Sequence, residues 1–131
     1  MLNDIQSRVF SRLKNKYPST LKTKYPNTRF TTSDRVPQNP TFPCIYVHER
    51  GSMELARDLQ GTTINAVRAT FQIEVTDTTS MDNATEVMNF VLNEMKVMRF
   101  EVVTMPEFDN TPSYYRKLAV FRRVIGDSDT L

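Results

Sequence analysis

An alternating strand pattern followed at once by a helical pattern constrains this chain more than any other feature. From residue 67 to residue 76 every second position is apolar, and the positions between are polar or charged. A period of two residues places the apolar side chains on one face of a β-strand. Apolar residues then recur three or four positions apart over 84–98, which predicts a helix with one buried stripe. We therefore expect this helix to pack on that face of a sheet.

Weaker patterns predict the other elements. Residues 3–16 form an amphipathic helix that Asn3 or Asp4 caps and Pro18 helps to end. The predicted strands are 28–32 at a sheet edge, 42–49, 65–76, 100–105 and 114–125, and the second helix ends near Met98. Pro106 is expected to end the fourth of these strands, and a polar loop follows it.

The order of elements predicts the fold class. Consecutive strands favour hairpins, so we expect an α+β fold of order α-β-β-β-α-β-β. Its sheet is largely antiparallel or mixed, has four to five strands, and carries two helices on one face. With 131 residues the chain is expected to form a single domain over 1–131, with 127–131 frayed at its end.

The connection from Arg50 to Thr63 is a candidate interaction segment. Gly51 and Gly61 flank its central piece, Met53 to Leu59, which either forms a helical turn or continues two strands as a long hairpin. Its candidate subunit-interface residues are Met53, Leu55, Arg57 and Leu59. Apolar side chains on a projecting connection are typical of a subunit contact. The alternative is simple packing across the sheet.

The last predicted strand is basic. Its charged residues are Arg116, Lys117, Arg122 and Arg123. Alternation places Arg116 and Arg122 on one face and the other two on the opposite face. These side chains either form a solvated face with packed aliphatic stems, or they face a partner subunit or the DNA in a lumen.

The sequence offers little for catalysis or for a cofactor. Cys44 and His48 share a strand face, but a thiol beside a strand-end histidine is more often structural than a nucleophile pair. The chain has three glycines, none in a phosphate-binding pattern, and its carboxylates are too scattered to hold a metal ion. We therefore expect no enzyme activity, no cofactor and no metal site.

Charge and hydropathy argue against several other classes of protein. The net charge is +2 and no run of five basic residues occurs, which argues against a dedicated nucleic-acid-binding protein. Charged residues interrupt the first 16 positions, so no signal peptide is expected. No segment has the ~18 apolar residues of a membrane span. The single cysteine cannot form an intramolecular disulfide, which is compatible with a reducing cytosol.

The whole pattern resembles a known family. The likeness is carried by the "TFPCIYVHE" strand, the "INAVRATFQIEVTDTT" strand and the "MDNATEVMNFVLNEM" helix, in this order after an amphipathic helix and a proline-rich stretch. This arrangement is similar to the small tail-terminator, tail-completion or head–tail joining proteins of long-tailed bacteriophages. The resemblance covers residues 1–126, and its closest points are Phe42–Pro43 and the segment 71–75.

The resemblance implies a structural virion protein of the tail or neck, assembled in the host cytoplasm. Such proteins form a homo-oligomeric ring, commonly a hexamer, at the head-proximal end of the tail tube. The ring stops tube polymerisation and presents a surface to head connector and neck proteins. DNA passes through its lumen without sequence-specific binding.

Three alternatives remain. The first is a neighbouring neck or head-completion protein. The second is a nucleic-acid-binding module that uses the arginines of the last strand, and the third is a small enzyme that uses Cys44 and His48.

Overall fold

The computed structural model describes residues 5–32, 41–50, 53–57, 64–110, 112 and 114–126. Within these residues the chain has three helices, α1 (Ile5–Lys16), α2 (Ser19–Lys24) and α3 (Met81–Val97). Its strands are β1 (Arg29–Thr31), β2 (Cys44–Glu49), β3 (Met53–Arg57), β4 (Ile64–Asp77), β5 (Glu101–Phe108) and β6 (Tyr115–Gly126). The predicted α+β class is confirmed, with α2 as an additional helix and β3 as an additional strand.

All six strands form one mixed sheet around β4. The strand order is β1-β2-β4-β6-β5, and β3 also pairs with β4. Every pairing is antiparallel except that of β1 with β2, which is parallel. The edge position expected for the short first strand is thus confirmed, and β5 forms the opposite edge.

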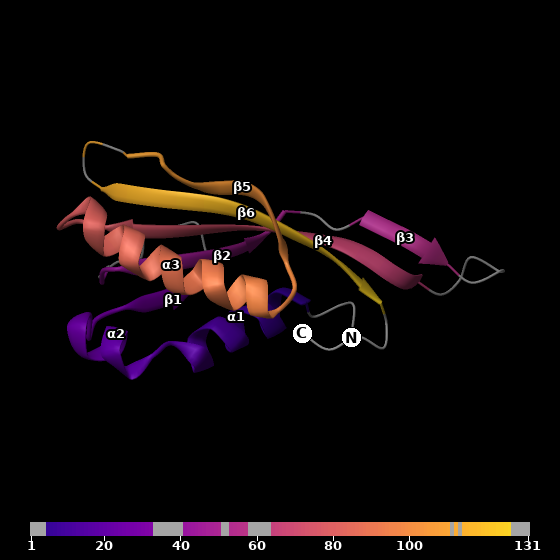
Figure 1. Cartoon of the computed structure of the whole chain (residues 1–131), viewed down its shortest axis with the longest axis horizontal. Coiled ribbons are helices and arrows are strands. Elements are labelled where there is room, and N and C mark those ends of the chain that lie inside the picture. The colour runs from indigo at the N-terminus through magenta and orange to yellow at the C-terminus, as the bar shows by residue number, and fades with distance from the viewer. Residues whose placement is uncertain are drawn as a thin grey trace.

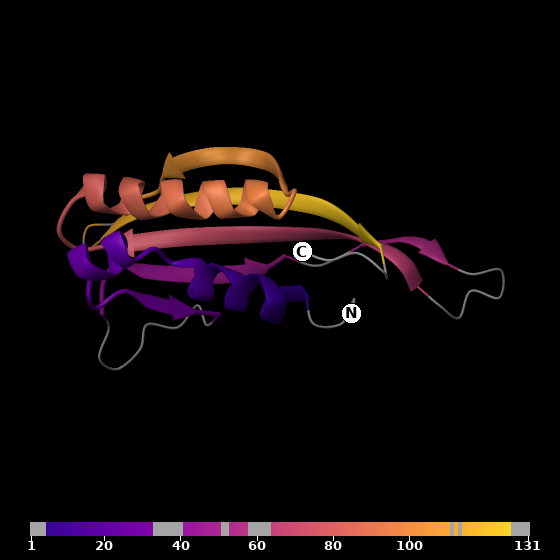
Figure 2. The same cartoon turned by 60° about the horizontal axis from the view of Figure 1, so that its bottom comes forward.

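Strand β4 carries two strands in succession along one of its edges. Residues 71–76 pair with β2, and residues 64–68 pair with β3. Between them the Arg50 N–H donates to the Thr70 carbonyl at 2.7 Å. The connection therefore continues the two strands as a long hairpin over 53–57, and the helical-turn alternative is wrong there. Figures 1 and 2 show β3 and the adjoining part of β4 extending beyond the helices.

The helices cover one face of the sheet (Figure 1). Helix α3 contacts β4, β5 and β6, while α1 contacts β2 and α3. The predicted alternation of β4 is confirmed, since its fully buried side chains Phe71, Ile73 and Val75 face the helices. The α3 stripe that meets them includes Val87, Met88, Val91 and Met95. Burying each of the larger side chains contributes about 2 kcal/mol.

Polar groups fix both ends of α3. The hydroxyl of Ser80 accepts from the Asn83 N–H at 3.2 Å and forms the N-cap of the helix. At the other end Arg99 has a positive φ of 66°. The Phe100 N–H then reaches the Met95 carbonyl at 2.9 Å, and the Arg99 N–H reaches that of Lys96. This left-handed turn directs the chain back into β5.

Two sequence-based predictions differ from the structure, one in a missing helix and one in the end of a strand. Helix α2 was missed because it has only six residues and buries one of them, Leu21, which leaves no periodic stripe to detect. Strand β5 does not end at Pro106 but continues to Phe108. Its register with β6 shifts between Thr104 and Glu107. An edge strand tolerates a proline at such an irregularity because no ladder hydrogen bond is needed from it.

Candidate functional site

The hairpin carries the first set of candidate residues. Met53, Leu55 and Arg57 lie on β3, and Leu59 lies outside the described residues. The pairing of β3 with β4 is irregular, with register shifts on both sides of Ala56. Such irregularities bend and twist a hairpin. The subunit interface expected at these four residues stays a prediction.

The basic residues of β6 divide between the two faces of the sheet, as alternation predicts. On the face opposite the helices, Arg116 pairs with Asp109 at 2.6 Å and Arg122 pairs with Glu101 at 3.3 Å. Each of these arginines therefore has a carboxylate partner in its own chain. This pairing weakens the strand as a nucleic-acid surface, because local carboxylates already offset its charge.

The other two basic residues of β6 lie on the helix-covered face. Lys117 Nζ donates to Thr85 Oγ1 at 3.2 Å and lies 4.8 Å from the centre of the Phe108 ring. Arg123 is only 9% exposed, and its Nη1 donates to the Met98 carbonyl at 2.9 Å. The expectation that Arg123 faces a partner or a lumen does not fit this burial, because its guanidinium caps the end of α3.

Cys44 and His48 do share the face of β2 opposite the helices, but Tyr46 lies between them. Residues four apart on an extended strand are about 13 Å apart. His48 is exposed and its ring stacks on Tyr46, with 5.7 Å between ring centres. Burial raises the pKa of the Cys44 thiol, and the charge of Arg29 lowers it in part. The two side chains therefore do not form a nucleophile–base pair.

A basic surface at the β1 edge was missed in the sequence. Residues 5–32 contain seven basic side chains and no acidic one. Lys24 pairs with Glu86 at 2.8 Å, and Arg12 lies 3.7 Å from Glu94. Lys14, Lys16 and Lys22 are exposed and form no ion pair with any part of the chain that the structure describes. We call Lys14, Lys22 and the pocket that they line the basic face.

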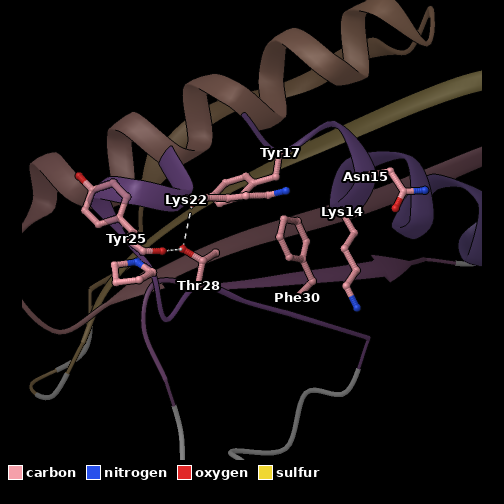
Figure 3. A pocket seen from close by; sticks show the side chains of 8 residues that line it. Lys14, Asn15, Tyr17, Lys22, Tyr25, Thr28 and Phe30 are labelled. Atoms are coloured by element: carbon pink, nitrogen blue, oxygen red, sulfur yellow. Dashed lines mark hydrogen bonds between the residues drawn. The ribbon is translucent and has the colours of Figure 1, made fainter. Parts of the chain in front are cut away.

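The pocket on the basic face has a volume of about 430 Å³ and lies between α1, α2 and β1 (Figure 3). Its lining combines two of the lysines with aromatic and polar side chains: Lys14, Asn15, Tyr17, Lys22, Tyr25, Pro26, Thr28 and Phe30. The pocket is therefore both positively charged and partly apolar.

Aromatic packing and hydrogen bonds hold the wall of this pocket. The ring of Tyr17 packs edge-on against Phe30 and Phe90, with 5.3 Å between centres in each pair. Its hydroxyl lies 2.9 Å from Thr28 Oγ1, which donates to the Tyr25 carbonyl. Burial raises the pKa of Tyr17, while the Thr28 hydrogen bond lowers it in part. The wall is thus preformed, and the exposed Lys14 and Lys22 lie beside it.

The signal for this surface is present in the sequence as a charge asymmetry. The basic residues of 5–32 are spread too widely to form a run, and the fold brings Lys14 and Lys22 to one pocket. The lack of acidic residues over 5–32 marks this segment, whereas no run of basic residues does.

Neither a metal-ligating cluster nor a membrane-spanning helix occurs among the described residues. No group of three His, Cys, Asp or Glu side chains there is placed to hold a metal ion. None of the described helices is long and apolar enough to span a membrane. No protein-family model and no curated protein sequence matches the chain.

Proposed function

We propose that this chain is a structural assembly protein of a long-tailed bacteriophage or prophage particle, a tail-terminator or tail-completion protein. In this function it forms a ring, a hexamer as the resemblance implies, at the head-proximal end of the tail tube. The ring stops tube polymerisation and joins the tail to the head connector, and DNA passes through it.

The long hairpin of β3 and β4 is the observation that carries this proposal. It extends beyond the part of the sheet that the helices cover (Figure 2). A hairpin without a helix over it is suited to contact a neighbouring chain, by side chains or by strand pairing. The observed element order also agrees with the resemblance, apart from the short helix α2 and strand β3.

Deleting the gene from the phage or prophage that encodes it tests the proposed function. We expect tail tubes of uncontrolled length that do not join heads, and normal particles when the wild-type gene is supplied in trans. Electron microscopy of the particles provides the measurement. Normal tail length and normal head joining in the deletion strain would contradict the proposal.

A hairpin variant tests the interface residues directly. Leu55→Asp should prevent complementation, because a carboxylate in a subunit contact must lose its hydration. Val124→Asp is the matched control, since Val124 is 53% exposed on β6. If both variants complement the deletion, Leu55 is not part of a subunit interface. That result concerns Leu55 alone and leaves the test of the function to the deletion strain.

A further inference from the structure

The edge of the sheet opposite the basic face has the complementary chemistry. Residues 101–115 contain three acidic side chains and no basic one, and two of the three, Glu101 and Asp109, pair with arginines of β6. Glu107 is exposed and forms no ion pair with the described residues. Val103 and Met105 on the same strand are 48% and 64% exposed. We call Val103, Met105 and Glu107 the acidic edge.

We infer that the acidic edge of one copy of this chain docks on the basic face of a second copy. Met105 lies against the aromatic wall of the pocket, and Glu107 lies among Lys14 and Lys22. The inference rests on the proposed function for its biological setting, because a ring requires such a contact between subunits.

Charge is the first argument for a second copy as the occupant. The basic face draws a negative partner, and one chain carries both the excess of lysines and the unpaired glutamate. Complementary charges on two surfaces steer association and set its register. No outside partner is needed to explain either surface.

Apolar matching is the second argument. The pocket volume of about 430 Å³ lies within the range of ~300–1,000 Å³ that encloses a small-molecule-sized group. It therefore has room for the Met105 side chain. Methionine adapts its shape to irregular apolar walls and packs well on aromatic rings such as Phe30. An exposed methionine beside a carboxylate thus matches a pocket of aromatic rings beside lysines.

The acidic edge and the basic face lie on opposite sides of the molecule, so a contact between them joins copies head to tail. Figures 1 and 2 both place β5 on one side of the molecule and β1, α1 and α2 on the opposite side. Two different patches on opposite sides form a heterologous interface, which generates a ring when the rotation between copies closes. The proline and register shifts of β5 disfavour sheet extension, so side chains make this contact.

Charge reversal tests the inference. Glu107→Lys on the acidic edge, and Lys14→Glu with Lys22→Glu on the basic face, each place like charges opposite one another. We expect each change to weaken self-association about tenfold or more. One chain that carries all three substitutions should regain most of the lost affinity. Sedimentation velocity and native mass spectrometry of the full chain measure the assembly.

The controls separate charge and apolar effects from loss of folding. Lys96→Glu reverses an exposed lysine on α3 and should leave assembly unchanged. Met105→Asp should weaken assembly by itself, whereas Val124→Asp should not. Circular dichroism checks that every variant is folded.

Three results would overturn the inference. The first is a wild-type chain that stays monomeric at its highest soluble concentration. The second is an assembly that the reversed charges do not weaken. The third is a combined variant that recovers no affinity although the separate reversals lose it, which would point to another partner for one of the surfaces. The gene-deletion experiment tests the proposed function separately from all three.

Discussion

The guanidinium of Arg123 donates a 2.9 Å hydrogen bond to the carbonyl oxygen of Met98, and so joins β6 to the end of α3. The last carbonyls of a helix lack partners within the helix, and the helix dipole makes them attractive to a cation. Arg123 is 9% exposed, so its guanidinium donates to a carbonyl at a place that water reaches poorly. One buried arginine thus fixes the helix layer to the sheet.

Replacing Arg123 with Met should lower the free energy of unfolding by about 2–3 kcal/mol, because a hydrogen bond from a charged donor is lost and a buried carbonyl loses its partner. Urea unfolding followed by circular dichroism measures the change. Arg122→Met is the matched control. Its exposed pair with Glu101 should contribute less than about 1 kcal/mol. Equal losses in the two variants would contradict the structural role of Arg123.

Arg99→Gly should raise the free energy of unfolding by about 1 kcal/mol. Arg99 has a φ of 66°, where a Cβ atom is crowded and glycine is not. Thermal unfolding measures the gain. Arg99→Ala keeps the Cβ and should give no such gain, so a similar increase in both variants would rule out relief of backbone crowding as its cause.

The sequence predicts the centre of this fold well because its periodicity is strong there. Phe71, Ile73 and Val75 alternate in a strand that is covered on one face, and Val87 and Met88 follow the helical period. Both patterns arise directly from burial. The sequence did not predict α2 or the continuation of β5 beyond Pro106, and both failures have the same cause. Tertiary contacts decide short elements and edge irregularities, and no local pattern records them.

The surfaces were predictable only in part. Alternation correctly divides the charges of β6 between two faces, but only the fold shows that Arg123 caps α3 and that Arg116 meets Asp109. The basic face needs three separate elements, α1, α2 and β1, to meet around Tyr17. Its counterpart Glu107 lies far along the chain. Sequence spacing does not show which of these surfaces lie on opposite edges.

Burial of Cys44 predicts a slowly reacting thiol. Because burial raises its pKa above the ordinary value of 9.0, the folded chain holds less thiolate at pH 8 than the unfolded chain. Alkylation by iodoacetamide at pH 8 should therefore be severalfold slower in the folded protein than in urea. Equal rates would show that the thiol is neither shielded nor perturbed.

The same pKa shift sets a pH dependence for stability. The folded state holds the Cys44 proton more tightly, so this contribution is fully present below the unfolded pKa and is lost as the pH rises through the raised folded pKa. Wild-type stability should fall relative to Cys44→Ala above about pH 9, as measured by urea unfolding. A constant difference between the two proteins from pH 7 to pH 10 would contradict the shift.

Asp77 should be among the most sensitive polar residues of the chain. It is 3% exposed, and one carboxylate oxygen accepts from the N–H groups of Thr79 and Ser80 and from the Asn83 side chain at 2.9–3.2 Å. Asp77→Ala leaves these donors without their partner, and we expect a loss of about 2–3 kcal/mol in urea unfolding.

Asp82→Ala is the control for this loss, since Asp82 is exposed in the first turn of α3 and acts mainly on the helix dipole. Its loss should stay below about 1 kcal/mol. Asp77→Asn should fall between the two, because its amide oxygen still accepts hydrogen bonds but carries no charge. If Asp77→Ala and Asp82→Ala cost the same, the dipole rather than the buried hydrogen bonds would account for the effect.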